Sequence, residues 1–174
     1  NPYWDPAASG IVAGWNLSHR RHHLYRAMLE GIAFEHRLAI EGIVASSGEP
    51  VTEHVILGGG SRSDLWCQIM ADVLGATVAR ARSADATNLG AGILAAFAAG
   101  WYQTIEAAAR AMTATVRTFT PDQSASGWYD QLFRDVYRPL FPAIRPYLDR
   151  LAEVTEAIAM EASFPAATAL PGMA

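Results

Sequence analysis

One short run combines residue types that can contact a ligand through the backbone: Gly58, Gly59, Gly60, Ser61, Arg62 and Ser63. Because glycine has no Cβ atom, the backbone of this run can lie directly against a ligand. A helical pattern follows, and the free N–H groups and dipole at a helix start favour polar or anionic groups. The run therefore predicts either a nucleotide contact or a tight strand-to-helix turn without a ligand.

The glycine run matches the dinucleotide-binding fingerprint only in part. Gly58 and Gly60 occupy the first two glycine positions, but Ser63 stands where the third glycine belongs. In addition, no acidic residue ends the next predicted strand, where the fingerprint has one to bind a ribose. Ser63 is instead placed to cap the following helix or to donate a hydrogen bond to a ligand.

A second group of candidate residues is the histidine cluster, His19, His22 and His23. Spacings of three and four residues place two imidazoles on one helical face, as a metal site requires. A third ligand and supporting hydrogen-bond partners are not evident nearby, so the alternative is a polar helix start. We assign no metal ligand and no catalytic residue from the sequence.

The remaining reactive side chains are expected to have structural roles. Cys67 lies inside an apolar helical pattern, where packing is the expected role of a free thiol. Asp64 and Asp72 are two turns apart on one predicted helix. We expect Asp64, in the first turn, to interact favourably with the helix dipole and Asp72 to lie on a solvated face. The run 88–92, rich in small residues, predicts close helix packing, with direct ligand contact as the alternative.

The elements that position these residues follow from hydrophobic periodicity. Ser18 is expected to cap a helix of about 25 residues, buried over much of its circumference, that ends before Gly48. A buried strand over 53–57, the glycine turn, a helix over 64–74 and a strand over 77–81 predict a parallel or mixed sheet. We further expect helices over 87–99 and 104–112, an edge strand over 116–119, and a kinked or broken helix pair over 128–159 that contains Pro139, Pro142 and Pro146.

Composition narrows the range of functions. The 174 residues suit one domain, and 17% charged residues is below the roughly 25% of soluble domains, so part of the surface should be covered. All thirteen basic residues are arginines, which excludes lysine-dependent chemistry within this chain. The net charge of −4 without a basic stripe argues against nucleic acid as a partner.

The sequence constrains the cellular location of the protein only weakly. A single cysteine fits a reducing compartment, and the sequence shows neither a signal peptide nor an apolar run of the roughly 20 residues that a membrane span needs. A cytoplasmic location without membrane association is therefore expected. A chain that starts at Asn1, without an initiating methionine, is also what an internal fragment of a longer polypeptide would show.

Four ordered motifs resemble the C-terminal domain of the FGGY carbohydrate kinases, most closely the xylulokinase-like pentulose kinases. The motifs are Pro2-Tyr3-Trp4-Asp5-Pro6, the run from His23 to Phe34, the run from Gly58 to Trp66 with Gln68, Ala71 and Asp72, and Leu89-Gly90-Ala91-Gly92. The similarity extends from Asn1 to about Arg150. It implies an α/β fold: an actin-like ATPase (ribonuclease H-like) C-terminal lobe, with a mixed sheet and packed helices.

The resemblance also implies roles for residues of the glycine turn. Gly58, Gly59 and Gly60 would lie against the adenosine part of ATP, and Ser63 would hydrogen-bond the base. Residues 89–92 would lie in a helix that packs behind the site. The catalytic Asp and most sugar contacts of the family belong to an N-terminal lobe that this chain does not contain.

The resulting expectation is a partial kinase lobe over 1–160, lacking its N-terminal part, and a flexible tail over 161–174. It would bind ATP, or ADP after the reaction, with Mg²⁺ as cofactor, for phosphoryl transfer to a ketopentose or related polyol. A homodimer is expected, and the isolated chain is expected to be inactive. Two alternatives remain at this point: a non-catalytic actin-like interaction module, and a metal-binding regulatory domain that uses the histidines.

Overall fold

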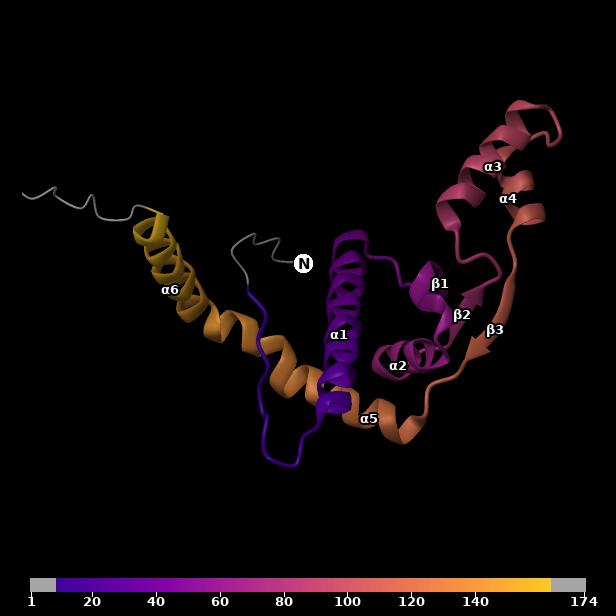
Figure 1. The fold of residues 1–174 in the computed structure, drawn as a ribbon. Helices are drawn as coiled ribbons and strands as arrows, with labels where there is room; N and C mark the ends of the chain where they lie inside the picture. The colour runs from indigo at the N-terminus through magenta and orange to yellow at the C-terminus, as the bar shows by residue number, and fades with distance from the viewer. Residues whose placement is uncertain (1–8, 164–174) are drawn as a thin grey trace, which may run out of the picture.

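The computed structural model describes residues 9–163, which form several helices and one small sheet (Figure 1). The expected motif at 2–6 and residues 164–174 of the expected tail lie outside this range. In chain order the elements are α1 (Arg21–Ser47), β1 (His54–Ile56), the 3-10 helix η1 (Gly59–Arg62), α2 (Asp64–Leu74), β2 (Val78–Ala81), α3 (Ala86–Ala98), α4 (Ile105–Met112), β3 (Thr115–Phe119), α5 (Gln123–Leu132), the π-helix η2 (Phe133–Tyr137) and α6 (Arg138–Ser163).

The three strands form a mixed sheet in the order β1-β2-β3, which confirms the predicted sheet class. β1 and β2 run parallel, with His54 opposite Val78, whereas β2 and β3 run antiparallel, with Val78 opposite Phe119. The prediction that the first strand is buried is wrong, because Val55 is 43% exposed. As an edge strand, β1 has a neighbouring strand on only one side in the described sheet.

Helix α2 connects the sheet to the rest of the core. It packs against α1 and α5 and contacts β2 and β3. Its ends are those expected from the sequence, since the Ser63 side chain caps its start and Gly75 ends it in a left-handed conformation. The core around it consists of Ala33, Phe34, Cys67, Ile69, Met70, Ala71, Val73, Val78, Phe119, Tyr129 and Phe133.

Helix α1 differs from its prediction in two respects. It begins at Arg21, with Arg20 as the N-cap residue, whose backbone N–H donates to the His23 side chain, so Ser18 is not the cap. On this helix only Ala33 and Phe34 are fully buried, so the expectation of burial around much of its circumference is wrong. Exposed apolar side chains instead lie along it: Tyr25, Met28, Ile32 and Ile43.

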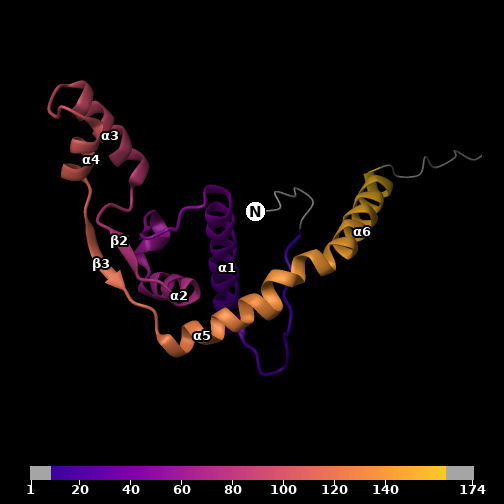
Figure 2. The ribbon, with the colours of Figure 1, turned by 180° about the vertical axis from the view of Figure 1, so that it is seen from behind.

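The C-terminal helices follow one long, bent path (Figure 2). The predicted break at the prolines is wrong, because Pro142 and Pro146 lie inside α6, whereas the bent path is consistent with the kink that was the other form of the prediction. The change of geometry falls earlier, at the π-helix η2, where the buried Phe133 packs on Phe34 with a ring separation of 5.7 Å. A π-turn accommodates an extra residue within a helical path, so the chain keeps its helical course before the prolines.

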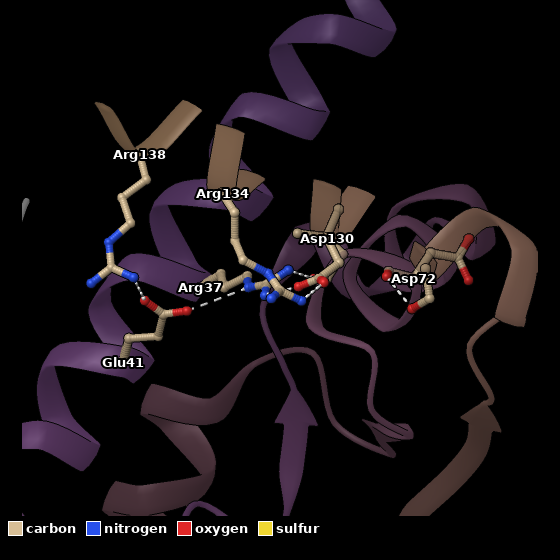
Figure 3. A network of polar contacts seen from close by, with 8 residues as sticks. Arg37, Glu41, Asp72, Asp130, Arg134 and Arg138 are labelled. Carbon is tan, nitrogen blue, oxygen red and sulfur yellow. Dashed lines mark hydrogen bonds and ion pairs between the residues drawn. The ribbon is translucent and has the colours of Figure 1, made fainter. Parts of the chain in front are cut away.

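Ion pairs fasten this helical path to α1 (Figure 3). Arg37 on α1 donates to Asp130 on α5 at 2.5 Å, and Arg134 pairs with the same carboxylate. One turn further along, Glu41 of α1 accepts Arg138 at 3.4 Å. Arg37 also lies 4.2 Å from the centre of the Phe133 ring, so the same side chain joins the polar and apolar parts of the contact.

Tyr137 offers a pH-dependent test of this contact. Its hydroxyl donates to Glu35 at 2.7 Å, and the hydroxyl oxygen lies 3.2 Å from the Gly31 carbonyl oxygen. Burial, together with the nearby Glu35 carboxylate, raises the pKa of Tyr137. Because the folded pKa lies above the unfolded value of about 10, the stabilisation is complete below that pH and is lost as the pH rises toward the folded pKa.

We expect Tyr137→Phe to lower the free energy of unfolding at pH 8 by about 0.5–1.5 kcal/mol, with the difference shrinking above about pH 10. Denaturant unfolding between pH 8 and 11 measures this. Tyr147→Phe is the matched control, because Tyr147 is 76% exposed on α6. A difference for Tyr137→Phe that stays constant across this pH range would contradict the assignment.

Candidate functional site

The glycine turn lies between the end of β1 and the start of α2. Gly58 has φ +86°, in the left-handed region where side chains other than glycine are strained, and Gly59 to Arg62 form a single 3-10 turn. A Cβ atom on Gly59 would meet no atom within 4 Å. On Gly60 it would lie 3.5 Å from the Trp66 ring, which is ordinary contact. The turn therefore presents an open backbone surface.

Ser63 lies at the junction of the turn and α2. Its side chain accepts a hydrogen bond from the Trp66 N–H at 3.3 Å, so the predicted helix cap is confirmed. The side chain is exposed, and its hydroxyl hydrogen remains available to a ligand acceptor. The structure thus brings the three glycines and Ser63 together at one helix start, while a contact of Ser63 with a base stays a prediction.

Ser61 supports the turn from its buried side, a role that the sequence did not suggest. Its hydroxyl donates to the Gly58 carbonyl at 2.7 Å, and its backbone N–H donates to the same oxygen at 3.1 Å. Ser61 is only 2% exposed. These two bonds close the turn beneath Gly59 and Gly60.

An ion-pair cluster adjoins the turn. Asp64, in the first turn of α2, accepts Arg80 from β2 at 2.6 Å and also pairs with Arg117 from β3. The hydrogen bond from Arg80, with the charge of Arg117, holds the pKa of Asp64 below its usual range. The cluster leaves the start of α2 with no unpaired negative charge from Asp64, which suits an anionic ligand.

Asp72 corrects the expectation of a solvated carboxylate. It is 6% exposed and accepts hydrogen bonds from the Gln68 side chain and from the Asp122 N–H, both at 2.8 Å. The Ser126 hydroxyl donates to the Asp72 carbonyl at 2.6 Å. Asp72 therefore joins α2 to the start of α5, and nothing in its sequence spacing indicates these partners.

The histidine cluster lies at the opposite end of α1 from the glycine turn (Figure 1). His19 Nδ1 accepts the Asn16 N–H, and His23 Nδ1 accepts the Arg20 N–H, each at 3.0 Å. Desolvation and the neighbouring imidazoles lower the pKa of His23. In residues 9–163 no three His, Cys, Asp or Glu side chains are grouped as metal ligands.

The small-residue helix α3 packs mainly against α4, where a Cβ atom on Gly92 would lie 3.7 Å from Met112. This confirms close helix packing for that run. The two helices form a hairpin that stands away from the glycine turn in both views (Figures 1 and 2). A position directly behind the turn, as the resemblance implied for residues 89–92, is therefore not what the described structure shows.

None of the helices described within 9–163 combines the length and apolar character needed to cross a lipid bilayer. An apolar groove does occur between α1 and α6, away from the glycine turn. Its lining includes Ile11, Leu24, Met28, Phe141 and Ile144.

A model of the FGGY family of carbohydrate kinases, C-terminal domain, matches residues 1–99, which include the glycine turn. Among curated proteins, the chain is 31% identical to a xylulose kinase of Bacillus subtilis over 140 residues, covering 80% of this chain and 28% of that protein. It is 42% identical to a glycerol kinase of Citrifermentans bemidjiense over 120 residues, covering 69% of this chain and 24% of that protein. The chain thus spans about a quarter of the length of these relatives.

Comparison with solved structures also finds sugar kinases. The xylulose kinase from Rhodospirillum rubrum matches with a TM-score of 0.70 and 33% identity, over 83% of this chain and 29% of that one. A gluconate kinase from Lactobacillus acidophilus matches with a TM-score of 0.75 over 86% of this chain and 30% of that one. Because the two sequences are only 22% identical, this match supports the fold alone. The α/β architecture expected from the sequence, that of the actin-like sugar kinases, is confirmed.

Proposed function

Because this chain belongs to the FGGY family of carbohydrate kinases, we propose that it is the nucleotide-binding part of an ATP-dependent sugar or polyol kinase. The observation that carries the proposal is the open glycine turn at the start of α2. Such a surface admits a flat, polar group against the backbone and places donors beside it. The chain spans about a quarter of its relatives, so the activity is proposed for the longer protein of which it would be one part.

In this proposal the adenosine of ATP lies on the turn. Gly59 and Gly60 offer a backbone face without side chains, and Gly58 supplies the left-handed bend that exposes it. Ser63, while it caps α2, donates its hydroxyl hydrogen to the base. Arg80 and Arg117 neutralise the charge of Asp64, so that this carboxylate does not repel an anionic nucleotide at the start of α2.

Phosphoryl transfer itself depends on groups outside this chain. The reaction needs the γ-phosphate, Mg²⁺ and an acceptor hydroxyl held in line, and catalysis is mostly positioning and charge stabilisation. The donor set near the turn suits adenosine rather than a metal, because Asp64 is already engaged by two arginines. We therefore assign Mg²⁺ and the catalytic base to other parts of the enzyme, and expect the isolated chain to be inactive.

The exposed apolar side chains of this chain are consistent with a surface that another part of the enzyme covers. Exposed apolar side chains lie along α1, α3 and α6, including Met28, Leu94 and Leu151. We propose that the second lobe of the kinase covers part of this surface and that the enzyme is a homodimer in the cytoplasm. Residues 1–160 are proposed as the lobe and 161–174 as its tail.

The acceptor class follows from the relatives, whose names are xylulose, glycerol and gluconate kinase. We propose a ketopentose or related polyol as the substrate. Measuring ATP-dependent phosphorylation of D-xylulose, D-ribulose, glycerol and gluconate by the complete enzyme tests this. Turnover with a ketopentose or a polyol such as glycerol is expected; turnover only with gluconate would correct the substrate, and no turnover with any of them would contradict the kinase assignment.

Ser63→Ala is expected to raise the Kd for ADP by about three- to tenfold, because one hydrogen bond to the base is lost. The variant also loses a helix cap worth about 1 kcal/mol. Thr104→Ala is the matched control, since the Thr104 hydroxyl caps α4 by accepting the Ala107 N–H at 3.1 Å. Calorimetry with the complete enzyme should show weaker ADP binding only for Ser63→Ala; equal Kd values for both variants would remove the assigned contact.

A further inference from the structure

The glycine turn is held in shape by a chain of hydrogen bonds that passes through the buried Ser61 and Cys67 side chains and reaches the sheet. Its first member is Ser61, whose hydroxyl and N–H both donate to the Gly58 carbonyl. With that oxygen engaged twice, the residues between Gly58 and Ser61 are fixed in one bend. The open backbone of Gly59 and Gly60 is the outer side of this bend.

The second member is Cys67, one turn into α2. Its side chain is fully buried, and its thiol donates to the Ser61 carbonyl at 3.3 Å. The same sulfur lies 3.5 Å from Nη2 of Arg80, which belongs to β2. Arg80 is in turn fixed by Asp64 at 2.6 Å, so β2, α2 and the turn are joined through one sulfur atom.

This arrangement has a steric consequence as well as a polar one. Cys67 has no exposed surface, and the Ser61 carbonyl lies directly against its sulfur. A larger group on the sulfur has no room unless the turn moves outward. Conversely, a ligand that occupies the outer side of the turn opposes that movement.

We propose that Ser61 and Cys67 are positioning residues of the nucleotide-binding turn. Ser61 closes the turn, and the Cys67 thiol holds the Ser61 carbonyl so that the backbone of Gly59 and Gly60 is presented to adenosine. This inference rests on the proposed function of the turn. It predicts that nucleotide binding and chemical modification of the Cys67 thiol exclude one another.

The first test separates the hydrogen bond from the packing of Cys67. We expect Cys67→Ala to raise the Kd for ADP by about three- to tenfold, and Cys67→Ser, which keeps a donor, to restore most of the affinity. Val73→Ala is the control, since Val73 is equally buried on α2 and its side chain belongs to the core. It should lower the melting temperature without changing the Kd.

The second test measures modification of Cys67 in the complete enzyme. Trypsin cleaves after Arg62 and Arg80, so Cys67 is recovered in the peptide 63–80. Its rate of alkylation by iodoacetamide, followed by mass spectrometry, should fall by about tenfold or more when saturating ADP is present, because the bound state must open before the thiol reacts.

The outcomes distinguish this inference from the proposed function. If ADP binds but neither slows alkylation nor distinguishes Cys67→Ala from the wild type, the positioning role is overturned while the nucleotide site stands. If Cys67→Ser binds ADP as weakly as Cys67→Ala, the thiol acts by its volume and the hydrogen-bond role is overturned. If the wild-type enzyme does not bind ADP, the nucleotide assignment fails and this inference fails with it.

Discussion

Gly59→Leu is expected to raise the Kd for ADP by at least about tenfold while leaving the fold intact, because the new side chain fills the space assigned to adenosine. A Cβ atom at Gly59 meets no protein atom within 4 Å, and the backbone there is not left-handed. The melting temperature should therefore stay close to that of the wild type, since replacing an exposed glycine without strain does not destabilise the protein. Calorimetric titration of the complete enzyme with ADP measures the loss.

Gly127→Leu provides the matched control for this substitution. Gly127 lies on α5, and a Cβ atom there likewise meets no atom within 4 Å. The same change in size and hydrophobicity is thus made away from the glycine turn. Equal ADP affinity for Gly59→Leu and the wild type would mean that the outer side of the turn is not occupied by nucleotide.

Asp72→Ala is expected to give the largest loss of stability among the polar substitutions considered, roughly 2–4 kcal/mol, because two donors lose the buried carboxylate that accepts from them. The donors are the Gln68 amide and the Asp122 N–H, both at 2.8 Å from one carboxylate oxygen. Since Asp122 caps α5, the start of that helix is expected to loosen as well. Denaturant unfolding of the complete enzyme at pH 7 measures the effect.

Asp72→Asn is the control for this prediction, because its amide oxygen can still accept from both donors. We expect it to keep most of the stability that Asp72→Ala loses. If the two variants were equally unstable, the negative charge rather than the acceptor geometry would be the source of the stabilisation. If neither were destabilised, the contacts of Asp72 would contribute nothing to the folded state.

Features governed by neighbouring residues were predictable from the sequence. Ser63 is confirmed as a helix cap, and the helix after it runs over 64–74 as predicted, because caps and helix ends depend on residues within one turn of the chain. The strand, turn, helix and strand around the glycines also follow from local periodicity, and with them the mixed sheet. The buried position of Cys67 was likewise indicated by its apolar neighbours.

Features that depend on distant partners were not predictable. Asp72 is buried because its partner Asp122 lies 50 residues away, and no local pattern distinguishes it from a solvated carboxylate. The ion pair of Asp64 with Arg117 joins residues 53 apart. Likewise, the prolines predicted a kinked or broken helix pair, whereas they lie inside the unbroken helix α6 and the π-helix η2 precedes them. Only the folded arrangement brings these groups together.

If the glycine turn holds the adenosine of ATP, as we propose, a crystal structure of the complete enzyme with ADP will show it. We expect the adenine ring or ribose to lie within about 4 Å of Gly59 and Gly60. The Ser63 hydroxyl should donate to the base while the Cys67 sulfur keeps its contact with the Ser61 carbonyl. ADP bound elsewhere, with no contact to residues 58–63, would rule out a nucleotide site at the glycine turn.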